Sequence, residues 1–292
     1  MLAVLDASAV RRWCHAGAEA LAAHRGEIDD LNVYPIPDGD TGTNLELTLR
    51  SAAEAVTGDR SAGAGTVLRA MAHGAVMGAR GNSGVIVSQV LCGLADACEG
   101  VVEAGGATLV SGLRLASDAA YAAVSEPVEG TVLSVIRASA EATEQLLRSE
   151  PDCGLAAVVT EAVQAAELAL SRTPQQLAVL AQAGVVDAGG RGLVVLLHEL
   201  ASVVTGEQAP RQPGSSARPA PRNRAALRSV RESGSAEFGY EVQYLLHASV
   251  EAVATLKAVL AELGDSLVVV GTGHGLFNVH VHVNDVGAAI EA

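Results

Sequence analysis

The sequence NVYPIPDGDTGTN, residues 32–44, joins two segments in which apolar residues recur every three and four positions. That recurrence is the period of a helix with one buried face. Pro35 and Pro37 keep the joining segment out of a helix, and the run from Thr41 to Asn44 leads directly into the second apolar segment. The stretch therefore predicts two helices that meet at a polar loop, and the chain as far as Thr205 repeats this arrangement.

The first two thirds of the chain are predicted to be helical. Hydrophobic residues make up 49% of the 292 residues but aromatic residues only 2%, so the core is built from Ala, Val and Leu, which favours closely packed helices over a β-sandwich. We expect roughly eight or nine helices with Gly, Pro or Asp-Gly at most junctions. They are predicted near residues 8–25, 42–57, 65–78, 84–99, 107–124, 130–148, 154–171, 175–183 and 190–204.

A linker and a second domain are predicted after residue 205. Residues 206–234 are rich in Pro and Arg and have no sustained apolar period, which is typical of a flexible linker. Residues 235–292 then predict a small α/β domain in the order β-α-β-β. In its last strand, Asn278, His280 and His282 point to one face and the intervening Val residues to the other. The chain stops as another helix begins, so this domain is expected to be incomplete.

Composition and charge exclude several classes of function. The net charge of −14 argues against a general affinity for nucleic acid, so no nucleic-acid partner is expected. Lys257 is the only lysine, so neither a P-loop nor the protein-kinase lysine pattern can be drawn. The four cysteines form no C-x-x-C pair, and we find no signal peptide and no transmembrane segment of about 18 uninterrupted apolar residues. These features favour a cytoplasmic protein.

Asp38 and Asp40 are the first candidate metal ligands. Two carboxylates two residues apart, with Gly39 between them, can converge on one hard cation such as Mg²⁺. Gly42, Thr43 and Asn44 follow at the start of a helix, where backbone N–H groups favour anions. The alternative is a plain turn followed by a capped helix.

Three more glycine-containing helix starts repeat this pattern. They lie at residues 78–84 (GARGNSG), 127–131 (PVEGT) and 186–192 (VDAGGRG). Generic helix capping explains any one of them. Alternate loops of an up-and-down bundle share one end, so these junctions are expected to converge on one rim, where they could surround a nucleotide.

These motifs, in this order and at these intervals, resemble the DhaL or DAK2 domain of the dihydroxyacetone kinase family. They are most similar to the ATP-binding kinase component of bacterial fatty acid kinase, whose middle domain residues 235–292 also resemble. The resemblance implies an eight-helix up-and-down barrel around a lipid-like interior, with ATP and two Mg²⁺ ions at one rim. It also implies γ-phosphoryl transfer to a substrate that a separate protein presents.

The resemblance also assigns roles to individual residues. Asp38 and Asp40 match the Mg²⁺ ligands, and with Thr43 they form the expected catalytic set. The third metal-binding Asp of the dihydroxyacetone kinases falls at Val33, whereas Asn32 matches the fatty acid kinase pattern and is the expected third ligand. Nucleotide contacts are expected at Thr41, Gly42, Thr43, Asn44, Asn82, Ser83, Gly84, Gly130, Thr131, Arg172, Asp187 and Gly189.

His280 and His282 are candidates for a second metal site. Residues two apart on one strand face lie about 7 Å apart at Cα, a spacing common in metal sites, and Glu241 offers a third ligand. The relatives carry Cys at the position of Glu241, and the resemblance implies zinc there. His274 is an alternative ligand, and the other alternative is a solvated strand face.

We therefore expect an ATP- and Mg²⁺-dependent kinase component that phosphorylates the carboxylate of a fatty acid held by a binding-protein partner. A homodimer is also expected. One rival is a component of the dihydroxyacetone (glycerone) kinase type that acts on a small triose. The other is a non-catalytic, nucleotide- or metal-dependent regulatory module, because the chain ends before the further domain that docks the acyl-carrying partner in the relatives.

Overall fold

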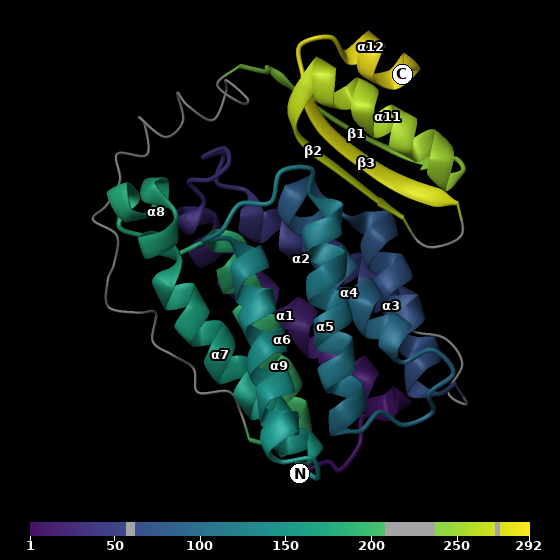
Figure 1. The fold of residues 1–292 in the computed structure, drawn as a ribbon, viewed down its shortest axis with the longest axis vertical. Coiled ribbons are helices and arrows are strands. Elements are labelled where there is room, and N and C mark those ends of the chain that lie inside the picture. The colour runs from purple at the N-terminus through teal and green to yellow at the C-terminus, as the bar shows by residue number, and fades with distance from the viewer. Residues whose placement is uncertain (57–61, 208–236, 272–274) are drawn as a thin grey trace.

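The computed structural model describes residues 1–56, 62–207, 237–271 and 275–292, and within them a helical bundle carries a small sheet at one end (Figure 1). The predicted linker at 206–234 lies outside the described residues except for its first two positions. The helices before it are α1 (Ala7–Leu31), α2 (Thr41–Ala55), α3 (Ala64–Gly78), α4 (Gly81–Ala97), α5 (Gly106–Ala123), α6 (Val132–Ser149), α7 (Leu155–Gln176), α8 (Ala178–Ala183) and α9 (Ala188–Thr205).

Eight long helices of the described chain form a closed ring. Each helix from α1 to α7 packs on its neighbours in sequence, α7 packs on α9, and α9 packs back on α1. The six-residue α8 lies between α7 and α9 outside this ring. The predicted eight-helix up-and-down barrel is therefore confirmed.

The first helix is longer than the sequence predicts. The expected end lies near residue 25, but α1 continues to Leu31. Gly26 and two consecutive aspartates are weak helix formers, which favours an earlier end. Ile28 is fully buried in the bundle, so packing extends the helix against local propensity.

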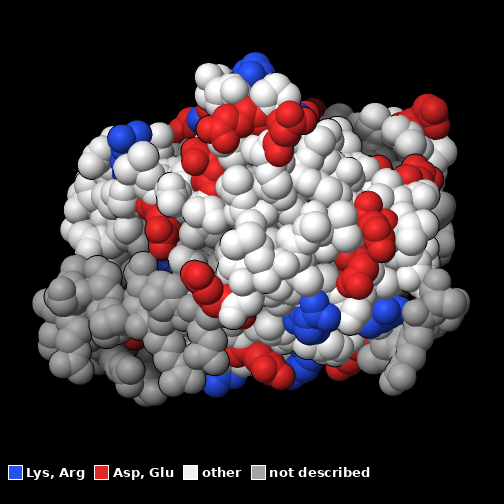
Figure 2. Space-filling model, turned by 90° about the horizontal axis from the view of Figure 1, so that it is seen from below, with Lys and Arg blue, Asp and Glu red and all other residues white. Residues whose placement is uncertain are grey.

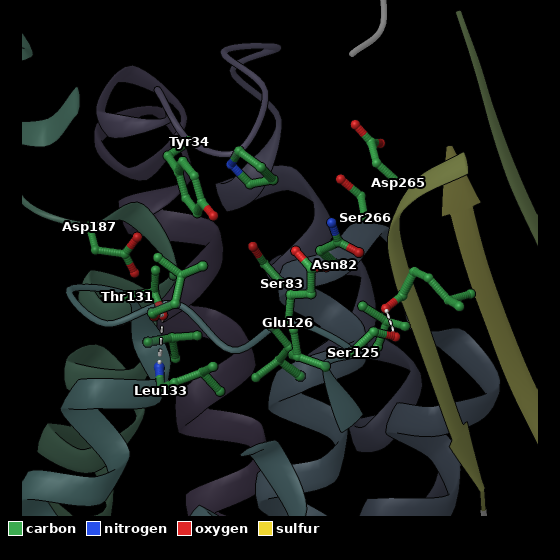
Figure 3. A pocket seen from close by; sticks show the side chains of 18 of the residues that line it. Tyr34, Asn82, Ser83, Ser125, Glu126, Thr131, Leu133, Asp187, Asp265 and Ser266 are labelled. Atoms are coloured by element: carbon green, nitrogen blue, oxygen red, sulfur yellow. Dashed lines mark hydrogen bonds between the residues drawn. The ribbon is translucent and has the colours of Figure 1, made fainter. Parts of the chain in front are cut away.

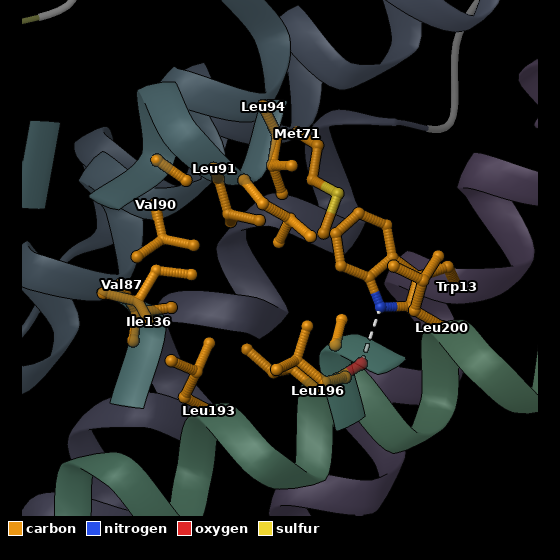
Figure 4. Close-up of a cluster of buried hydrophobic side chains, with 14 of the residues drawn as sticks. Trp13, Met71, Val87, Val90, Leu91, Leu94, Ile136, Leu193, Leu196 and Leu200 are labelled. Carbon is orange, nitrogen blue, oxygen red and sulfur yellow. Dashed lines mark hydrogen bonds between the residues drawn. The ribbon is translucent and has the colours of Figure 1, made fainter. Parts of the chain in front are cut away.

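Side chains fill the interior of the bundle (Figure 4). Leu, Val and Met side chains pack around Trp13, whose ring N–H donates to the carbonyl oxygen of Leu196 at 2.9 Å. A cavity between Leu68 and Leu94 measures only about 20 Å³, room for about one water molecule. The lipid-like interior that the resemblance implied therefore has no counterpart in this part of the core.

Helix α9 is long and apolar enough to cross a membrane, with a mean hydropathy of 1.2 over 18 residues. However, 61% of that window is buried inside the protein. Its Leu193, Leu196 and Leu200 side chains belong to the bundle core (Figure 4). The apolar composition of α9 is thus explained by its position in the ring.

The second unit is an antiparallel sheet with helices on one face. It contains β1 (Tyr240–His247), α11 (Val250–Leu263), β2 (Gly264–Gly271), β3 (Leu276–Val283) and α12 (Val286–Glu291), and the strand order is β1-β3-β2. The predicted β-α-β-β order is confirmed. Val279, Val281 and Val283 pack with α11 in a core of their own.

The other face of the sheet packs on the helical bundle. Val268 and Val270 of β2 join a buried cluster with Val76 and Val85 of the bundle. The side-chain amide of Asn278 donates to the carbonyl oxygen of Val76 at 3.0 Å. The alternative of a solvated strand face is therefore wrong, because the bundle covers this face.

Acidic side chains cover more of the described bundle end opposite the sheet than basic side chains do (Figure 2). This agrees with the net charge of −14.

Candidate functional site

The loop between α1 and α2 holds its two aspartates close together. The side-chain amide of Asn32 donates to Asp38 Oδ1 at 2.5 Å, which folds the loop back on the end of α1. Burial and the neighbouring carboxylate of Asp40 raise the pKa of Asp38 to about 7. Two neighbouring carboxylates repel each other when both are ionised, and a bound cation would relieve that repulsion.

A small cavity of about 40 Å³ opens onto this loop. Asn32, Asp38 and Asp40 line it together with Thr41 and Asn44 from the start of α2. The Oδ1 atom of Asn32 is buried and has no hydrogen-bond partner. Two carboxylates and an unpartnered amide oxygen are the hard oxygen ligands that Mg²⁺ prefers, so these residues fit the predicted metal.

Gly42 and Thr43 support the loop without lining this cavity. The backbone N–H and the hydroxyl of Thr43 both donate to the carboxylate of Asp29, each at 3.0 Å. A Cβ at Gly42 would collide with the carbonyl oxygen of Arg25 on α1. Both residues therefore fix α2 against α1, and the structure places the hydroxyl of Thr43 on Asp29 instead of in the site.

Asn82 and Ser83 lie in the first turn of α4 and line both this cavity and a larger one beside it. The Oδ1 atom of Asn82 is buried without a partner. Gly84 lines neither cavity, and a Cβ there would collide with Thr48 Oγ1 on α2. Gly84 thus allows the two helices to approach closely, whereas the two polar residues face the site.

The larger cavity, of about 380 Å³, lies between the bundle rim and strand β2 (Figure 3). The predicted Thr131, Asp187 and Gly189 line it from the starts of α6 and α9. Thr131 accepts from the N–H of Leu133, and Asp187 accepts from the N–H of Gly190 at 2.7 Å. The separate helix starts that the sequence marked therefore converge on one cavity.

The pKa values of two side chains that line the larger cavity, a carboxyl and a phenol, are raised. Burial raises the pKa of Asp187 to about 6. Burial also raises the pKa of Tyr34, and the carboxylates of Asp187 and Glu126 raise it further. Figure 3 shows Tyr34 directed into the cavity between the rim and β2. Tyr34 links the two cavities, since it lines both.

Two other predicted contacts lie away from the cavity walls. Gly130 has a φ of 82°, and a Cβ there would lie 2.9 Å from Gln176 Cβ, so it shapes the loop before α6. Arg172 is exposed on α7 and lines neither cavity. No Lys or Arg is among the described lining residues of the two cavities. Cations and helix N-termini would therefore have to balance the charge of a bound phosphate.

Glu241, His280 and His282 form the second predicted cluster. Their ligand atoms lie within 4.8 Å of one another, and the Nε2 atoms of the two histidines are 3.2 Å apart. His280 and His282 are only 1% and 7% exposed. Burial and the neighbouring ring of His282 lower the pKa of His280 to about 3, so its imidazole is neutral and able to coordinate a metal. The alternative ligand His274 lies outside the described residues.

The cluster on the sheet and the aspartates of the rim share the small cavity. Glu241, His280 and His282 line it opposite Asp38 and Asp40. Burial raises the pKa of Glu241, and the carboxylate of Asp40 raises it further. Since the sheet packs on the rim, two clusters that are more than 200 residues apart in sequence become one polar site.

Sequence reasoning missed the part of the larger cavity that comes from β2. Asp265, Ser266 and Leu267 line it, and Ser125 of the rim donates from its hydroxyl to the carbonyl oxygen of Leu267 at 3.2 Å. No local motif marks these positions, because their role depends on how the sheet packs. Tyr34 was within the quoted stretch but was not singled out.

Comparisons with known proteins find two matching families. The DAK2 domain matches residues 35–202, and the FakA-like middle domain of fatty acid kinase matches residues 237–292. Protein YloV of Bacillus subtilis is 34% identical over 290 residues, which cover 97% of this chain and 52% of that protein. An uncharacterized protein of Staphylococcus saprophyticus is 38% identical over 207 residues, covering 71% of this chain and 37% of its own length. An uncharacterized protein of Staphylococcus haemolyticus is 34% identical over 276 residues, covering 93% of this chain and 50% of its own length. The chain thus spans about half the length, or less, of these curated relatives.

Proposed function

Because this chain belongs to the DAK2 domain family and continues into a FakA-like middle domain, we propose that it is a kinase component of the fatty acid kinase type. It would bind ATP with two Mg²⁺ ions and transfer the γ-phosphoryl group to the carboxylate of a fatty acid. A separate fatty-acid-binding protein would present that substrate. We also propose a cytoplasmic location and a homodimer.

The observation that carries this proposal is the pairing of two adjoining cavities. The smaller one gathers Asn32, Asp38 and Asp40, a ligand set suited to Mg²⁺. The larger one, of about 380 Å³, is of the size of small-molecule sites and is lined by the helix starts at Thr131 and Asp187. A nucleotide with its base side in the larger cavity would direct its phosphates toward the aspartates.

The proposed reaction needs little from the protein besides positioning and charge. An oxygen of the fatty acid carboxylate attacks the γ-phosphorus, the bond from that phosphorus to the β–γ bridging oxygen breaks, and the products are an acyl phosphate and ADP. The attacking carboxylate is already ionised, so no proton has to be removed. When bound, Mg²⁺ neutralises the charge on the phosphate oxygens. Asp38 and Asp40 would hold the cation, and the first turn of α4, where Asn82 and Ser83 line both cavities, would face the phosphates with its N–H groups.

We further propose that Glu241, His280 and His282 bind a zinc ion. The Nε2 atoms of the two histidines lie 3.2 Å apart, so both imidazoles could hold one ion. Nδ1 of His280 is buried without a hydrogen bond, although it lies 3.3 Å from Glu241 Oε1. These residues therefore fit the metal, which would add positive charge beside the transferred group.

Calorimetric titration of ATP with and without Mg²⁺ tests the nucleotide site. Asp38→Ala and Asp40→Ala should abolish the Mg²⁺-dependent part of the binding, whereas the control Asp30→Ala, at an exposed position of α1, should leave it intact. Unchanged affinity in both site variants would refute the assignment.

The acceptor is tested by measuring ADP release with two candidate substrates. We expect release with a fatty-acid-loaded binding protein and none with a free triose. Release with the triose alone would favour the dihydroxyacetone kinase type. ATP binding without transfer to either acceptor would favour the regulatory module.

A further inference from the structure

Two polar atoms without hydrogen-bond partners lie next to the histidine cluster, one on Asp265 and one on His282. The carboxylate Oδ1 of Asp265 and the ring Nδ1 of His282 are both buried and have no hydrogen-bond partner. They face each other at 3.8 Å. Buried polar atoms are rarely left unpaired, so each of them lacks a bond that the other could supply.

The sheet is built to bring this carboxylate to this ring. Asp265 of β2 is the register partner of His282 on β3, and the pairing shifts between Asp265 and Val268. Within that shift Ser266 adopts a φ of 54°, which is uncommon for a residue with a side chain. A Cβ at Gly264 would collide with the carbonyl oxygen of His282, so glycine permits the close approach of the two strands. The irregular end of β2 places Asp265 at the edge of the larger cavity (Figure 3).

The two nitrogens of His282 have different surroundings. Nε2 faces Nε2 of His280 at 3.2 Å, and two N–H groups cannot point at each other at that distance. Nδ1 faces the carboxylate of Asp265. A neutral ring with its proton on Nδ1 satisfies both sides, because it offers an N–H to the carboxylate and a lone pair toward His280.

We propose that Asp265 is a positioning residue that fixes His282 for metal binding through Nε2. In the bound state the Nδ1–H of His282 donates to Asp265, and the gap of 3.8 Å closes to about 3 Å. Metal-binding histidines commonly donate their second ring N–H to a carboxylate in this way, which orients the ring and raises its basicity. This inference rests on the metal site of the proposed function, and it adds a fourth residue, one that does not itself contact the metal.

Cobalt binding measures the consequence. Co²⁺ is titrated into the full chain by its visible absorption, and the signal that is absent from a His280→Ala, His282→Ala double variant is assigned to the cluster. Asp265→Ala should weaken Co²⁺ binding by about 10–100-fold. Asp265→Asn should weaken it less, because the amide oxygen can still accept the N–H. Glu262→Gln, a charge-removing control at an exposed position of α11, should bind like the unmodified chain.

Nitrogen-15 NMR of the metal-free protein provides a second measurement that a merely structural role would not change. We expect His282 to be protonated on Nδ1 in the unmodified chain and to become a mixture of tautomers in Asp265→Ala. Protonation of His282 on Nε2 in the unmodified chain would overturn the proposal, and so would normal Co²⁺ affinity in both Asp265 variants. If the unmodified chain binds no Co²⁺ at the cluster, the zinc site of the proposed function fails and the positioning role fails with it.

Discussion

Asp38→Asn should stabilise the metal-free protein at alkaline pH while removing its affinity for Mg²⁺. The pKa of Asp38 is raised from 3.8 to about 7, first by burial and then by the carboxylate of Asp40. The folded state therefore holds the ionised form at a cost that the unfolded chain does not have. An asparagine has no charge to bury, and its amide can donate to Asp40 while its oxygen still accepts from Asn32.

The magnitude and its pH range follow from the two pKa values. A difference of about three pH units corresponds to about 4 kcal/mol, and the partial solvent access of this loop reduces it to about 2 kcal/mol. The folded-state pKa is the higher one, so the contribution of Asp38 to stability is fully present below pH 3.8. This stabilising contribution is lost progressively as the pH rises to about 7, and the free energy of unfolding then changes no further on account of Asp38.

Urea unfolding of both proteins at pH 5 and pH 8, without metal, measures this effect. The free energy of unfolding of the unmodified chain should fall relative to that of Asp38→Asn between the two pH values. Added Mg²⁺ should restore stability to the unmodified chain only. Asp30→Asn, which removes an exposed carboxylate from α1, should follow the unmodified chain. A difference between Asp38→Asn and the unmodified chain that does not change with pH would refute the reasoning.

Three further predictions concern the supports of the site. Thr43→Ala should lower the free energy of unfolding by about 1 kcal/mol, since it removes the hydroxyl bond to Asp29, and Thr43→Ser should recover most of the loss in the same urea experiment. Gly84→Ala should destabilise the protein by about 1–3 kcal/mol through its clash with Thr48, and the loss should shrink in a Thr48→Ala background; an equal loss in both backgrounds would contradict the packing argument. Phenanthroline, a chelator that prefers zinc over magnesium, should weaken Mg²⁺-ATP binding measured by calorimetry, because the histidine cluster lines the same cavity as the aspartates; unchanged affinity would mean that the two clusters act independently.

Much of the rim could be predicted because its signals are local. An N-cap residue is a polar residue immediately before a helix, so its position can be predicted from the local sequence. Thr131 before α6 and Asp187 before α9 are such residues. The positive φ at Gly130 is likewise a property of one residue in one turn. Such features depend on a few neighbouring residues, so they can be recognised without knowing the fold.

The roles of Thr43 and Gly84 could not be separated from those of their neighbours by sequence. Both lie in motifs that also contain cavity-lining residues, Asn44 and Ser83. Which side of a helix start faces a ligand and which faces another helix depends on the crossing of α2 with α1 and α4. Thr43 and Gly84 therefore support the site from positions that the motifs alone assigned to nucleotide contact.

The sequence by itself determined the helical bundle, the order of the second unit and the polar helix starts, because apolar period and capping chemistry act over one or two helical turns. Only the tertiary structure decided that the sheet covers the rim, that His280 and His282 are buried there, and that Asp265 stands behind His282. These arrangements arise from contacts between segments far apart in the chain, chiefly the packing of Val268 and Val270 on the bundle. Such a long-range contact cannot be recognised in the sequence of either segment, because valine is common in any β-strand and does not indicate which surface it packs on.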